Sequence, residues 1–379
     1  MENTFVSNIH LYFGLITLGA SLIAHLIIYW GLFYKLSKSK MLQNIFKILI
    51  FCNAIAVIGY IYLEEYPLPI WIYTILALSI GIGFIFFIFT LVYQLIILPL
   101  RFFSLKKLRK KIQNTMLIVC VLYTAYGIYV GQTSPILDSV TIPVKNLSRT
   151  LKIIQLSDVH ISTLMTQEKV KKIVDKVNAQ NPDVIVLTGD IVDTQSRFAK
   201  KALQALKNLK ASYGVYYVLG NHEYYHDIND IIKELKDIGL NILINDNMAI
   251  EIDKKPILNI AGIADLMGNK AGFLKPDITK ALQGINTTIP TIFLSHQPKI
   301  ISQTQDKPID LILAGHTHGG QIFPFSFAVL LDQPFIKGLH QLSKNQSIYI
   351  NQGTNLWGPP MRIGTHYEIT VINLIPSKP

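Results

Sequence analysis

The sequence predicts a membrane protein in two parts, an all-α bundle of four transmembrane helices followed by an α/β domain. Three observations support this prediction. Long apolar stretches fill the first third of the chain, strand-like and helix-like patterns alternate in the remainder, and polar residues recur where the strand-like runs end. Such alternation is typical of α/β domains, which form their sites at the carboxyl ends of strands.

The distribution of charge separates the two parts. The chain has 379 residues, of which 50% are apolar, and a net charge of +11. Residues 1–148 hold 11 Lys and Arg but only 4 Asp and Glu, a net charge of +7, so the remaining residues carry +4. We predict a membrane domain over residues 1–132, a linker over residues 133–149 and an α/β domain over residues 150–379. A charge of +4 gives that domain no clear basic footprint for a nucleic-acid partner.

Four stretches are apolar and long enough to cross the roughly 30 Å hydrocarbon core of a bilayer as helices. They cover residues 9–34, 45–63, 69–98 and 113–131. Buried helices of a soluble protein are the alternative, but four such stretches in a row favour a membrane bundle. Ionisable groups inside a membrane are functional candidates. Nothing else in the bundle resembles a proton relay, so we interpret His10 and His25 as neutral imidazoles bonded to neighbouring helices.

Basic side chains predict the orientation of the bundle. The loop before the second stretch contains three Lys between residues 35 and 40, and six Lys and Arg lie between residues 101 and 111 before the fourth. The loop before the third stretch has Glu64 and Glu65 instead. The positive-inside rule places both basic loops in the cytoplasm. We therefore expect a multi-pass protein of a bacterial inner (plasma) membrane, with the α/β domain on the extracytoplasmic side.

Short apolar runs bounded by turn residues predict the buried strands of the α/β domain. These runs cover residues 153–156, 184–187, 215–219, 291–294 and 311–314. Helical spacing of apolar residues predicts helices between the strands, and strands return near the end of the chain. The helices cover residues 166–179, 198–209 and 228–238, and the later strands cover residues 347–350 and 367–374.

Each of the five runs is followed by Asp, Asn or His. The clusters are Asp158-Val159-His160, Gly189-Asp190-Ile191-Val192-Asp193, Gly220-Asn221-His222-Glu223, Ser295-His296 and Gly315-His316-Thr317-His318. Oxygen and imidazole ligands without a thiolate indicate a hard or borderline divalent metal. Cys52 and Cys120 are the only cysteines and lie in apolar stretches. A cysteine nucleophile is therefore not expected.

In this order and at these spacings, the clusters resemble the calcineurin-like metallophosphoesterase superfamily over residues 150–375. The extension Gly319-Gly320-Gln321 and residues 358–362 look like its membrane-associated branch, which includes YkuE- and YaeI-type phosphoesterases. The resemblance implies a four-layer α/β/β/α sandwich, with two metals at the strand ends. Four membrane spans exceed the single anchor expected of that branch, so the role of the bundle cannot be carried over.

The resemblance also implies two metal-ligand sets that share one carboxylate, and it places His222 outside both sets as the proton donor. One set is Asp158, His160, Asp190 and His318, and the other is Asp190, Asn221, His296 and His316. The two divalent ions would be Mn, Fe, Zn or a similar metal.

The residue types fit this chemistry independently of the resemblance. Two divalent ions bind a phosphoryl oxygen and lower the pKa of a shared water, and a carboxylate such as Asp190 has two oxygens with which to bridge them. An imidazole such as His222 has a pKa suited to protonating a leaving group. Asp193 is a candidate to orient His222, and its alternative role is a helix N-cap. Glu223 is interpreted as a structural or rim residue.

Two further features bear on the substrate. Arg362 is a candidate substrate-binding residue because a guanidinium grips phosphate with two donors, and a salt bridge is the alternative. Residues 323–331 are apolar and too short to span a bilayer. They could form a core strand, but Pro324 interrupts that pattern. We therefore favour an exposed apolar lip that suits a lipid-bearing substrate at a membrane surface.

We therefore expect a membrane-anchored, dinuclear metal-dependent phosphoesterase. It would hydrolyse a phosphodiester, pyrophosphate or phosphomonoester bond by attack of a metal-activated hydroxide, with His222 as general acid. Its expected partners are the lipid bilayer and a phosphorylated small molecule, with a lipid-linked substrate as one candidate. The alternative enzyme is a UDP-2,3-diacylglucosamine pyrophosphatase with a cytosol-facing site. The alternative of another class is a non-catalytic membrane sensor or transport module.

Overall fold

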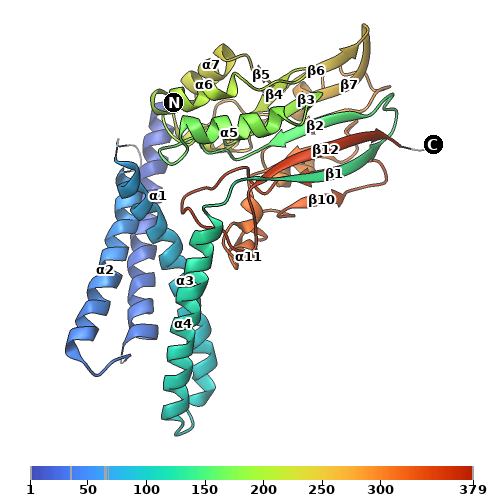
Figure 1. The fold of residues 1–379 in the computed structure, drawn as a ribbon. Coiled ribbons are helices and arrows are strands. Elements are labelled where there is room, and N and C mark those ends of the chain that lie inside the picture. The colour runs from blue at the N-terminus through green and yellow to red at the C-terminus, as the bar shows by residue number, and fades with distance from the viewer. Residues whose placement is uncertain (1, 35, 64–65, 67, 378–379) are drawn as a thin grey trace. The chain divides into compact units, whose positions relative to one another are not determined.

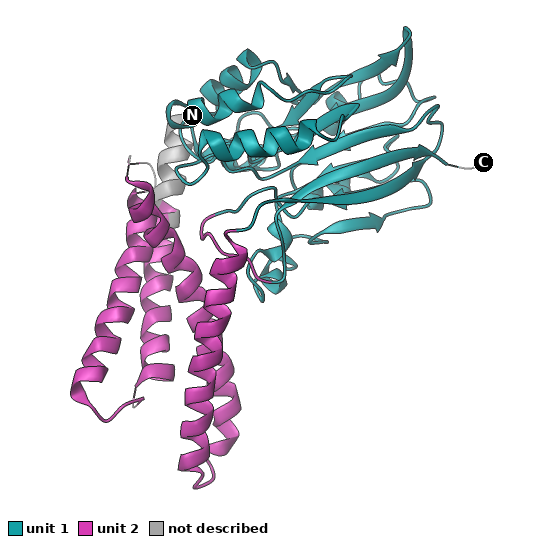
Figure 2. Cartoon of the chain, in the orientation of Figure 1, with its two compact units in different colours: residues 1–7, 133–357, 364–379 teal, residues 8–132, 358–363 magenta. Residues whose placement is uncertain are grey.

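The computed structural model describes residues 2–34, 36–63, 66 and 68–377, and only the backbone of residues 2–11 and 13. The chain forms two compact units (Figure 2). The helical unit contains Asn8–Gln132 together with the short segment Gly358–Ile363. The α/β unit contains Met1–Ser7, Thr133–Trp357 and Gly364–Pro379. The chain therefore leaves the α/β unit for six residues near its end and then returns.

Four long helices form the helical unit (Figure 1). They are α1 (Glu2–Ile28), which continues as a π-helical turn over Tyr29–Phe33, α2 (Lys40–Leu63), α3 (Ile70–Leu100) and α4 (Lys106–Val130). Within the described residues, each of them contains an apolar segment of at least 20 residues, which is about 30 Å of helix and matches a bilayer core. The prediction of four candidate membrane spans is confirmed. Glu64 and Glu65, used to predict the orientation, lie outside the described residues.

A hydrogen-bond network around His25 joins three of these helices. Its Nδ1 lies 2.7 Å from the carbonyl oxygen of Ser21 in α1, and its Nε2 lies 3.1 Å from Nδ2 of Asn53 in α2. Asn53 also donates to the carbonyl oxygen of Ser79 in α3, at 2.9 Å. An amide N–H can donate only to an unprotonated ring nitrogen, so the geometry agrees with a neutral, structural His25. The side chain of His10 lies outside the described residues.

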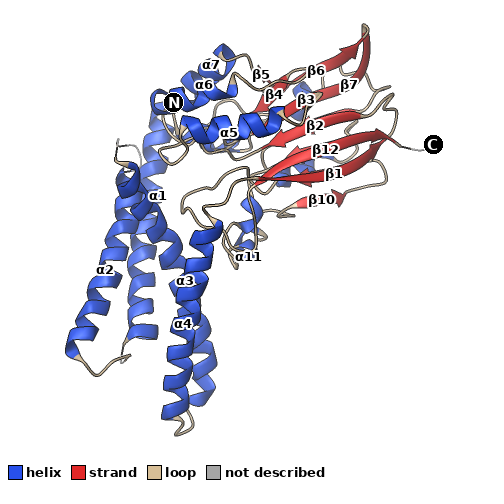
Figure 3. Cartoon of the chain, in the orientation of Figure 1, coloured by secondary structure: helices blue, strands red, loops and turns tan. Residues whose placement is uncertain are grey.

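Two six-stranded sheets form the centre of the α/β unit (Figure 3). In spatial order the first sheet contains β1 (Ile136–Val144), β12 (Glu368–Pro376), β2 (Leu151–Leu156), β3 (Val184–Thr188), β4 (Val215–Val218) and β5 (Asn241–Ile242). The second contains β10 (Gly338–Gln341), β11 (Ser347–Ile350), β9 (Leu311–Ala314), β8 (Thr291–Leu294), β7 (Lys255–Gly262) and β6 (Asp246–Ile252). Each predicted strand is present, and β1, β5, β6, β7 and β10 are additional strands.

Helices cover the outer faces of both sheets. The first sheet carries α5 (Gln167–Asn178), α6 (Ser196–Leu206) and α7 (Ile228–Asp237) (Figure 1), and the second carries α9 (Ile278–Ala281) and α10 (Ile301–Thr304). Successive side chains of a strand point to opposite faces, and β3 shows the result. Ile185 and Leu187 pack in the helix-side core, whereas Val184 and Val186 pack in the core between the sheets. The predicted four-layer α/β/β/α sandwich is confirmed.

The predicted linker over residues 133–149 is not a linker. It contains β1, which pairs in parallel with β12 over nine residues, from Ile136 with Glu368 to Val144 with Pro376. Ile142 and Val144 are buried in the core between the sheets. Pro135 and Pro143 lie in this segment, and an edge strand tolerates proline because one side of its backbone has no partner strand. The last helix therefore leads almost directly into the first sheet.

Residues 323–331 form a loop and the short helix α11 (Ser326–Val329), with no strand. The five large apolar side chains of this segment are 41% to 90% exposed, and we name them the apolar lip. They are Phe323, Phe325, Phe327, Leu330 and Leu331. The exposed interpretation of this segment agrees with the structure.

Candidate metal centre

The five polar clusters meet at one edge of the sandwich because of strand direction. β2, β3 and β4 are parallel within the first sheet, and β8 and β9 are parallel within the second. The cluster after each strand therefore emerges at the same end. Asp158 and Asp190 extend from the first sheet, and His296 and His316 extend from the second; all lie in or next to the groups that could hold a metal.

The backbone at this edge is strained. Asp158, His160, Asp190, His316 and His318 all have positive φ, between 45° and 71°. Each non-glycine residue in this left-handed region costs about 1–3 kcal/mol. Five such residues in one site show that the fold holds these side chains against their local backbone preference.

Three glycines permit the close approach of the clusters. Gly189 has a φ of +85° and would crowd His296 if it had a Cβ. Gly220 and Gly315 do not have positive φ, but neither has room for a side chain. A Cβ on Gly220 would lie 2.1 Å from Oδ1 of Asp190, and a Cβ on Gly315 would lie 1.8 Å from Oγ of Ser157. Only Gly189 therefore needs glycine for its backbone conformation. The other two are needed for space.

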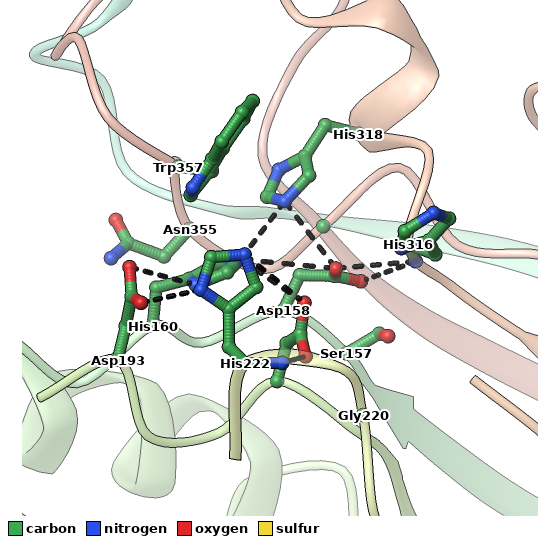
Figure 4. A network of polar contacts seen from close by, with 12 residues as sticks. Ser157, Asp158, His160, Asp193, Gly220, His222, His316, His318, Asn355 and Trp357 are labelled. Carbon is green, nitrogen blue, oxygen red and sulfur yellow. Dashed lines mark hydrogen bonds and ion pairs between the residues drawn. The ribbon is translucent and has the colours of Figure 1, made fainter. Parts of the chain in front are cut away.

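The first group of possible ligands comprises Asp158, His160 and His318 (Figure 4). Nε2 of His160 lies 3.0 Å from Nε2 of His318, which in turn lies 3.3 Å from Oδ1 of Asp158. The backbone N–H of His316 donates to the Asp158 carboxylate at 3.0 Å and so joins the ends of β2 and β9. Asp190 Oδ2 lies 3.9 Å from His160 Nε2 and is within reach of this group.

The second group comprises Asp190, His296 and His316, with Asn221 beside it. Nε2 of His296 lies 3.1 Å from Oδ2 of Asp190, from Oδ1 of Asn221 and from Nδ1 of His316. Nδ1 of His296 lies 2.8 Å from the carbonyl oxygen of Thr188, to which only an N–H can bond. In the neutral ring, Nε2 is therefore a lone pair directed at three further acceptors.

Such convergence of acceptors fits a divalent cation. Lone pairs that face each other at 3.0–3.1 Å repel unless a proton or a metal lies between them. The oxygen and imidazole donors are those preferred by borderline divalent metals. The donor set of the chain therefore fits the metal that the sequence predicts.

The electrostatics of the cluster also favour bound positive charge. Burial would raise the pKa of Asp158 and Asp190, but neighbouring histidines, chiefly His318 and His296, hold both pKa values well below the ordinary range. Burial would lower the pKa of His296, yet Asp190 raises it well above its usual value. Burial and His296 lower the pKa of His316 to about 3. The carboxylates thus stay ionised, and the buried site draws in cations.

His222 lies beside the metal groups and is oriented by Asp193. Its Nδ1 is 2.5 Å from Oδ1 of Asp193, and its Nε2 is 3.9 Å from Oδ2 of Asp190. The other carboxylate oxygen of Asp193 is 3.3 Å from Nδ1 of His160. Burial lowers the pKa of His222, but Asp193 and then Asp190 raise it to about 10. Asp193 does not cap the next helix, because Gln195 occupies that position.

Sequence reasoning missed the role of Glu223. Its fully buried carboxylate accepts four backbone N–H groups, from Asp190, Ile191, Val192 and Gly220, at 2.7–3.1 Å. It therefore joins the loops after β3 and β4, which carry Asp190 and Asn221. The structural interpretation of this residue agrees with the structure, but the rim interpretation does not. Nothing in its sequence position distinguished a buried carboxylate from an exposed one.

Trp357 was also missed, because it lies 39 residues after His318 in an irregular loop. Its indole ring lies 5.9 Å from the His222 ring and is 41% exposed. The ring of Tyr225 also lies near His222, 5.2 Å from its ring. The side chain of Gln321 bonds both backbone groups of Trp357, at 2.8 and 3.0 Å. The final residue of the Gly319-Gly320-Gln321 extension thus holds the loop.

Arg362 does not lie in the same unit as the other site residues. It belongs to the segment Gly358–Ile363 of the helical unit, and its backbone N–H donates to the carbonyl oxygen of Gly127 in α4, at 3.1 Å. Its side chain is fully buried. The substrate-binding role of Arg362 stays a prediction.

Comparison with known proteins adds the following. The sequence profile of calcineurin-like phosphoesterases matches residues 151–320. A metallophosphoesterase of Campylobacter jejuni is 33% identical over 375 residues, which cover 97% of this chain and 99% of its own. A transmembrane protein with a metallophosphoesterase domain from Danio rerio is 35% identical over 268 residues, or 68% of this chain and 61% of its own. The metallophosphoesterase YkuE of Bacillus subtilis is 32% identical over 232 residues, or 59% of this chain and 78% of its own.

Proposed function

This chain belongs to the calcineurin-like metallophosphoesterase family, and we propose that it is a membrane-anchored phosphoesterase that uses two divalent metal ions. The observation that carries the proposal is the convergence of lone pairs from five strand ends on two adjacent points. Asp190 lies between these points, within 3.1 Å of His296 and 3.9 Å of His160.

The proposed ligand sets follow from these distances. Asp158, His160 and His318 would hold one ion, and Asn221, His296 and His316 would hold the other. Asp190 would belong to both sets. When bound, two divalent ions neutralise the charge on a phosphoryl group and lower the pKa of a water molecule between them. Mn, Fe and Zn all suit this donor set.

The residues of the chain supply orientation and a proton. Asp193 accepts the Nδ1 proton of His222 and so leaves Nε2 to carry the proton that faces the site. In hydrolysis, water adds to phosphorus, the bond from phosphorus to the leaving oxygen breaks, and Nε2 of His222 donates its proton to that oxygen. Trp357 and Tyr225 flank the ring of His222 and limit its rotation and its contact with water.

The test of this function compares two leaving groups in the full-length protein purified in detergent. p-Nitrophenolate departs without a proton, whereas an alkoxide needs one. We expect turnover of bis-p-nitrophenyl phosphate that depends on added Mn²⁺ and stops with a chelator. His222→Ala should lose about 10²–10⁴-fold in kcat on a dialkyl phosphodiester and much less on the nitrophenyl ester.

His340→Ala is a matched control, because His340 stacks on Phe335 outside the metal groups. It should leave both activities unchanged. Metal-loaded protein that hydrolyses no phosphodiester, phosphomonoester or pyrophosphate would contradict the proposal, and so would equal losses on both leaving groups in His222→Ala.

We further propose that the substrate is lipid-linked and that the apolar lip contacts its lipid part. The lip lies next to the site in the structure. Gly320, two residues after His318, packs so closely on α11 that a Cβ added to it would lie 2.5 Å from Cα of Ser326. A fully buried Leu or Phe side chain contributes about 1.5–3 kcal/mol. Phe327→Ser or Leu331→Ser should therefore lower kcat/KM about tenfold or more on a phospholipid in mixed micelles, but not on bis-p-nitrophenyl phosphate. Leu339→Ser, at an exposed residue of β10, should leave the activity on both substrates unchanged.

For the location we propose a bacterial inner membrane with the α/β unit on the extracytoplasmic side. The support is the basic cluster at the start of α4, where Lys106, Lys107 and Arg109 lie in the first turn, together with the positive-inside rule. A C-terminal alkaline phosphatase fusion should be active in cells and a C-terminal green fluorescent protein fusion dark. The reverse result would overturn this orientation.

A further inference from the structure

A cavity of about 290 Å³ opens on the second metal-ligand set. Asn221 and His316, both proposed ligands, form part of its wall. The other lining residues include Tyr225, Lys270, Lys299 and Asp332. This volume is close to the lower limit of about 300 Å³ for small-molecule sites. The cavity can therefore hold a small substituent of a substrate whose phosphoryl group lies at the metals.

The cavity has an excess of positive charge. Lys299 Nζ lies 3.0 Å from Oδ2 of Asp332, and this pair is close to neutral. Lys270, exposed in the short helix α8 (Met267–Ala271), has no carboxylate within ion-pair distance among the described residues. One lysine charge therefore remains uncompensated beside a site that attracts phosphate.

The cavity is lined by residues other than the proposed proton donor. His222 belongs to the group with His160 and Asp193 and does not line the cavity. Tyr225 lies next to both, because it lines the cavity and its ring lies 5.2 Å from that of His222. A leaving oxygen must lie near His222 to receive its proton. The substituent that stays on phosphorus is thus directed to the cavity.

We infer that the cavity binds a second phosphate group, carried by the alcohol that stays on the phosphorus atom, with Lys270 and Lys299 as its counter-charges. This inference rests on the proposed function and narrows its substrate to a phosphodiester that bears an additional phosphate. A phosphomonoester has no substituent to place there. Water adds to the diester phosphorus, the leaving alcohol takes the proton of His222, and the additional phosphate remains intact.

The test uses two p-nitrophenyl diesters that differ by one phosphate. Both are thymidine 5′-(p-nitrophenyl phosphate), one with a free 3′-hydroxyl and one with a 3′-phosphate. The measured quantity is the ratio of their kcat/KM values in the full-length protein with Mn²⁺. A hydrogen bond to a charged group changes affinity about tenfold or more, so we expect a ratio of about 10 in favour of the 3′-phosphate.

Two variants should move this ratio in opposite directions. Lys270→Glu reverses the uncompensated charge and should bring the ratio to 1 or below. Asp332→Asn frees Lys299 from its ion pair and should raise the ratio several-fold. Lys280→Ala, at an exposed lysine outside the cavity, should leave both the ratio and the activity unchanged.

The outcomes separate this inference from the proposed function. A ratio near 1 in the unmodified protein, or a ratio that Lys270→Glu and Asp332→Asn leave unchanged, overturns the second-phosphate site while hydrolysis itself persists. A second measurement uses probes without a nucleoside, in case the nucleoside itself does not fit the cavity. It compares how strongly methylenebisphosphonate and methylphosphonate inhibit the hydrolysis of bis-p-nitrophenyl phosphate at fixed free Mn²⁺. This preference must also fall in Lys270→Glu if the inference holds. The absence of metal-dependent turnover on any ester would instead refute the proposed function.

Discussion

Asp193, which is not a proposed metal ligand, contacts two functional candidates at once. One of its oxygens lies 2.5 Å from Nδ1 of His222, and the other lies 3.3 Å from Nδ1 of His160. One carboxylate therefore contacts both the proposed proton donor and a proposed metal ligand. It also sets the protonation of His222, whose pKa would fall on burial but rises to about 10 beside Asp193 and Asp190.

Asp193→Asn should lower both metal affinity and activity by about 10–100-fold, the usual effect of losing a residue that orients a metal-ligating histidine. The variant should also change the pH profile. A general acid works only while protonated, so activity falls as pH rises through the pKa of His222. Asp193 raises that pKa, so its removal must move the alkaline limb of kcat/KM to lower pH, whereas bound cations lower the pKa in both proteins. A limb that stays in place in Asp193→Asn would contradict this role. Asp175→Asn on α5, outside the site, is the control.

Glu223 acts on the backbone of the site. Its carboxylate accepts N–H groups from two loops, and an amide cannot do this, because one of its two polar atoms is a donor. Glu223→Gln should leave buried N–H groups without acceptors, at a cost of about 1–3 kcal/mol for each group. Thermal unfolding of the purified protein should show a lower Tm. Glu168→Gln, at an exposed residue of α5, should leave the Tm within experimental error, and an equal Tm in both variants would exclude the structural role.

Among the elements, the extension Gly319-Gly320-Gln321 holds the loop that carries Trp357 in place. The side chain of Gln321 makes two hydrogen bonds with the backbone of Trp357, and Thr365 Oγ1 donates to the carbonyl oxygen of Gln321 at 3.1 Å. The turn after β9 therefore organises the long loop between β11 and β12. This explains how Trp357 reaches His222 although the two are far apart in sequence.

Gln321→Ala should release this loop and lower kcat/KM about tenfold, since two partly buried hydrogen bonds of about 1 kcal/mol each are lost. In a background with Trp30 and Trp71 replaced by Phe, the fluorescence of Trp357 should shift to longer wavelength as its indole becomes more exposed. Gln321→Glu retains one acceptor and should show a smaller shift. An unchanged emission spectrum in Gln321→Ala would show that the loop is held by other contacts.

Elements of the fold differed in how well they could be predicted. The strands before the polar clusters are buried on both faces, so each is a continuous apolar run with clear ends. β1 is an edge strand with exposed residues and one proline, Pro143, and its pairing with β12 joins segments more than 200 residues apart. No local pattern records such a partner. The segment of the apolar lip was ambiguous for the same reason, because only the neighbouring elements determine whether an apolar run is covered.

At the scale of the whole molecule, the helical unit includes a piece of the C-terminal region. Gly358–Ile363 packs on the last turns of α4, where a Cβ on Gly131 would lie 2.2 Å from the carbonyl oxygen of Pro360 and one on Gly127 would lie 2.8 Å from Cδ1 of Ile363. Met361 and Ile363 are buried there. The chain is therefore tied to its membrane helices at two places, through the end of α4 and through this segment.

Gly131→Ala should destabilise the protein by about 1–3 kcal/mol, the usual cost of overpacking, because its Cβ meets backbone that cannot rotate away. Thermal unfolding in detergent should show a lower Tm. Gly19→Ala in α1 is the matched control, since a Cβ at that residue has no atom within 4 Å. Equal Tm values for the two variants would mean that the segment does not pack on α4 in the membrane protein.

The four apolar helices, the α/β sandwich and the polar residues at the strand ends could be predicted from the sequence. These follow from local patterns: apolar length, the periodicity of buried side chains and the order of ligand types. The tertiary structure decided what depends on residues distant in sequence. It made residues 136–144 a strand instead of a linker, buried Glu223 under two loops, brought Trp357 to His222, and grouped Arg362 with the helices. In each case the arrangement is stabilised by contacts with residues distant in the sequence. The local sequence around the residue therefore does not predict its position.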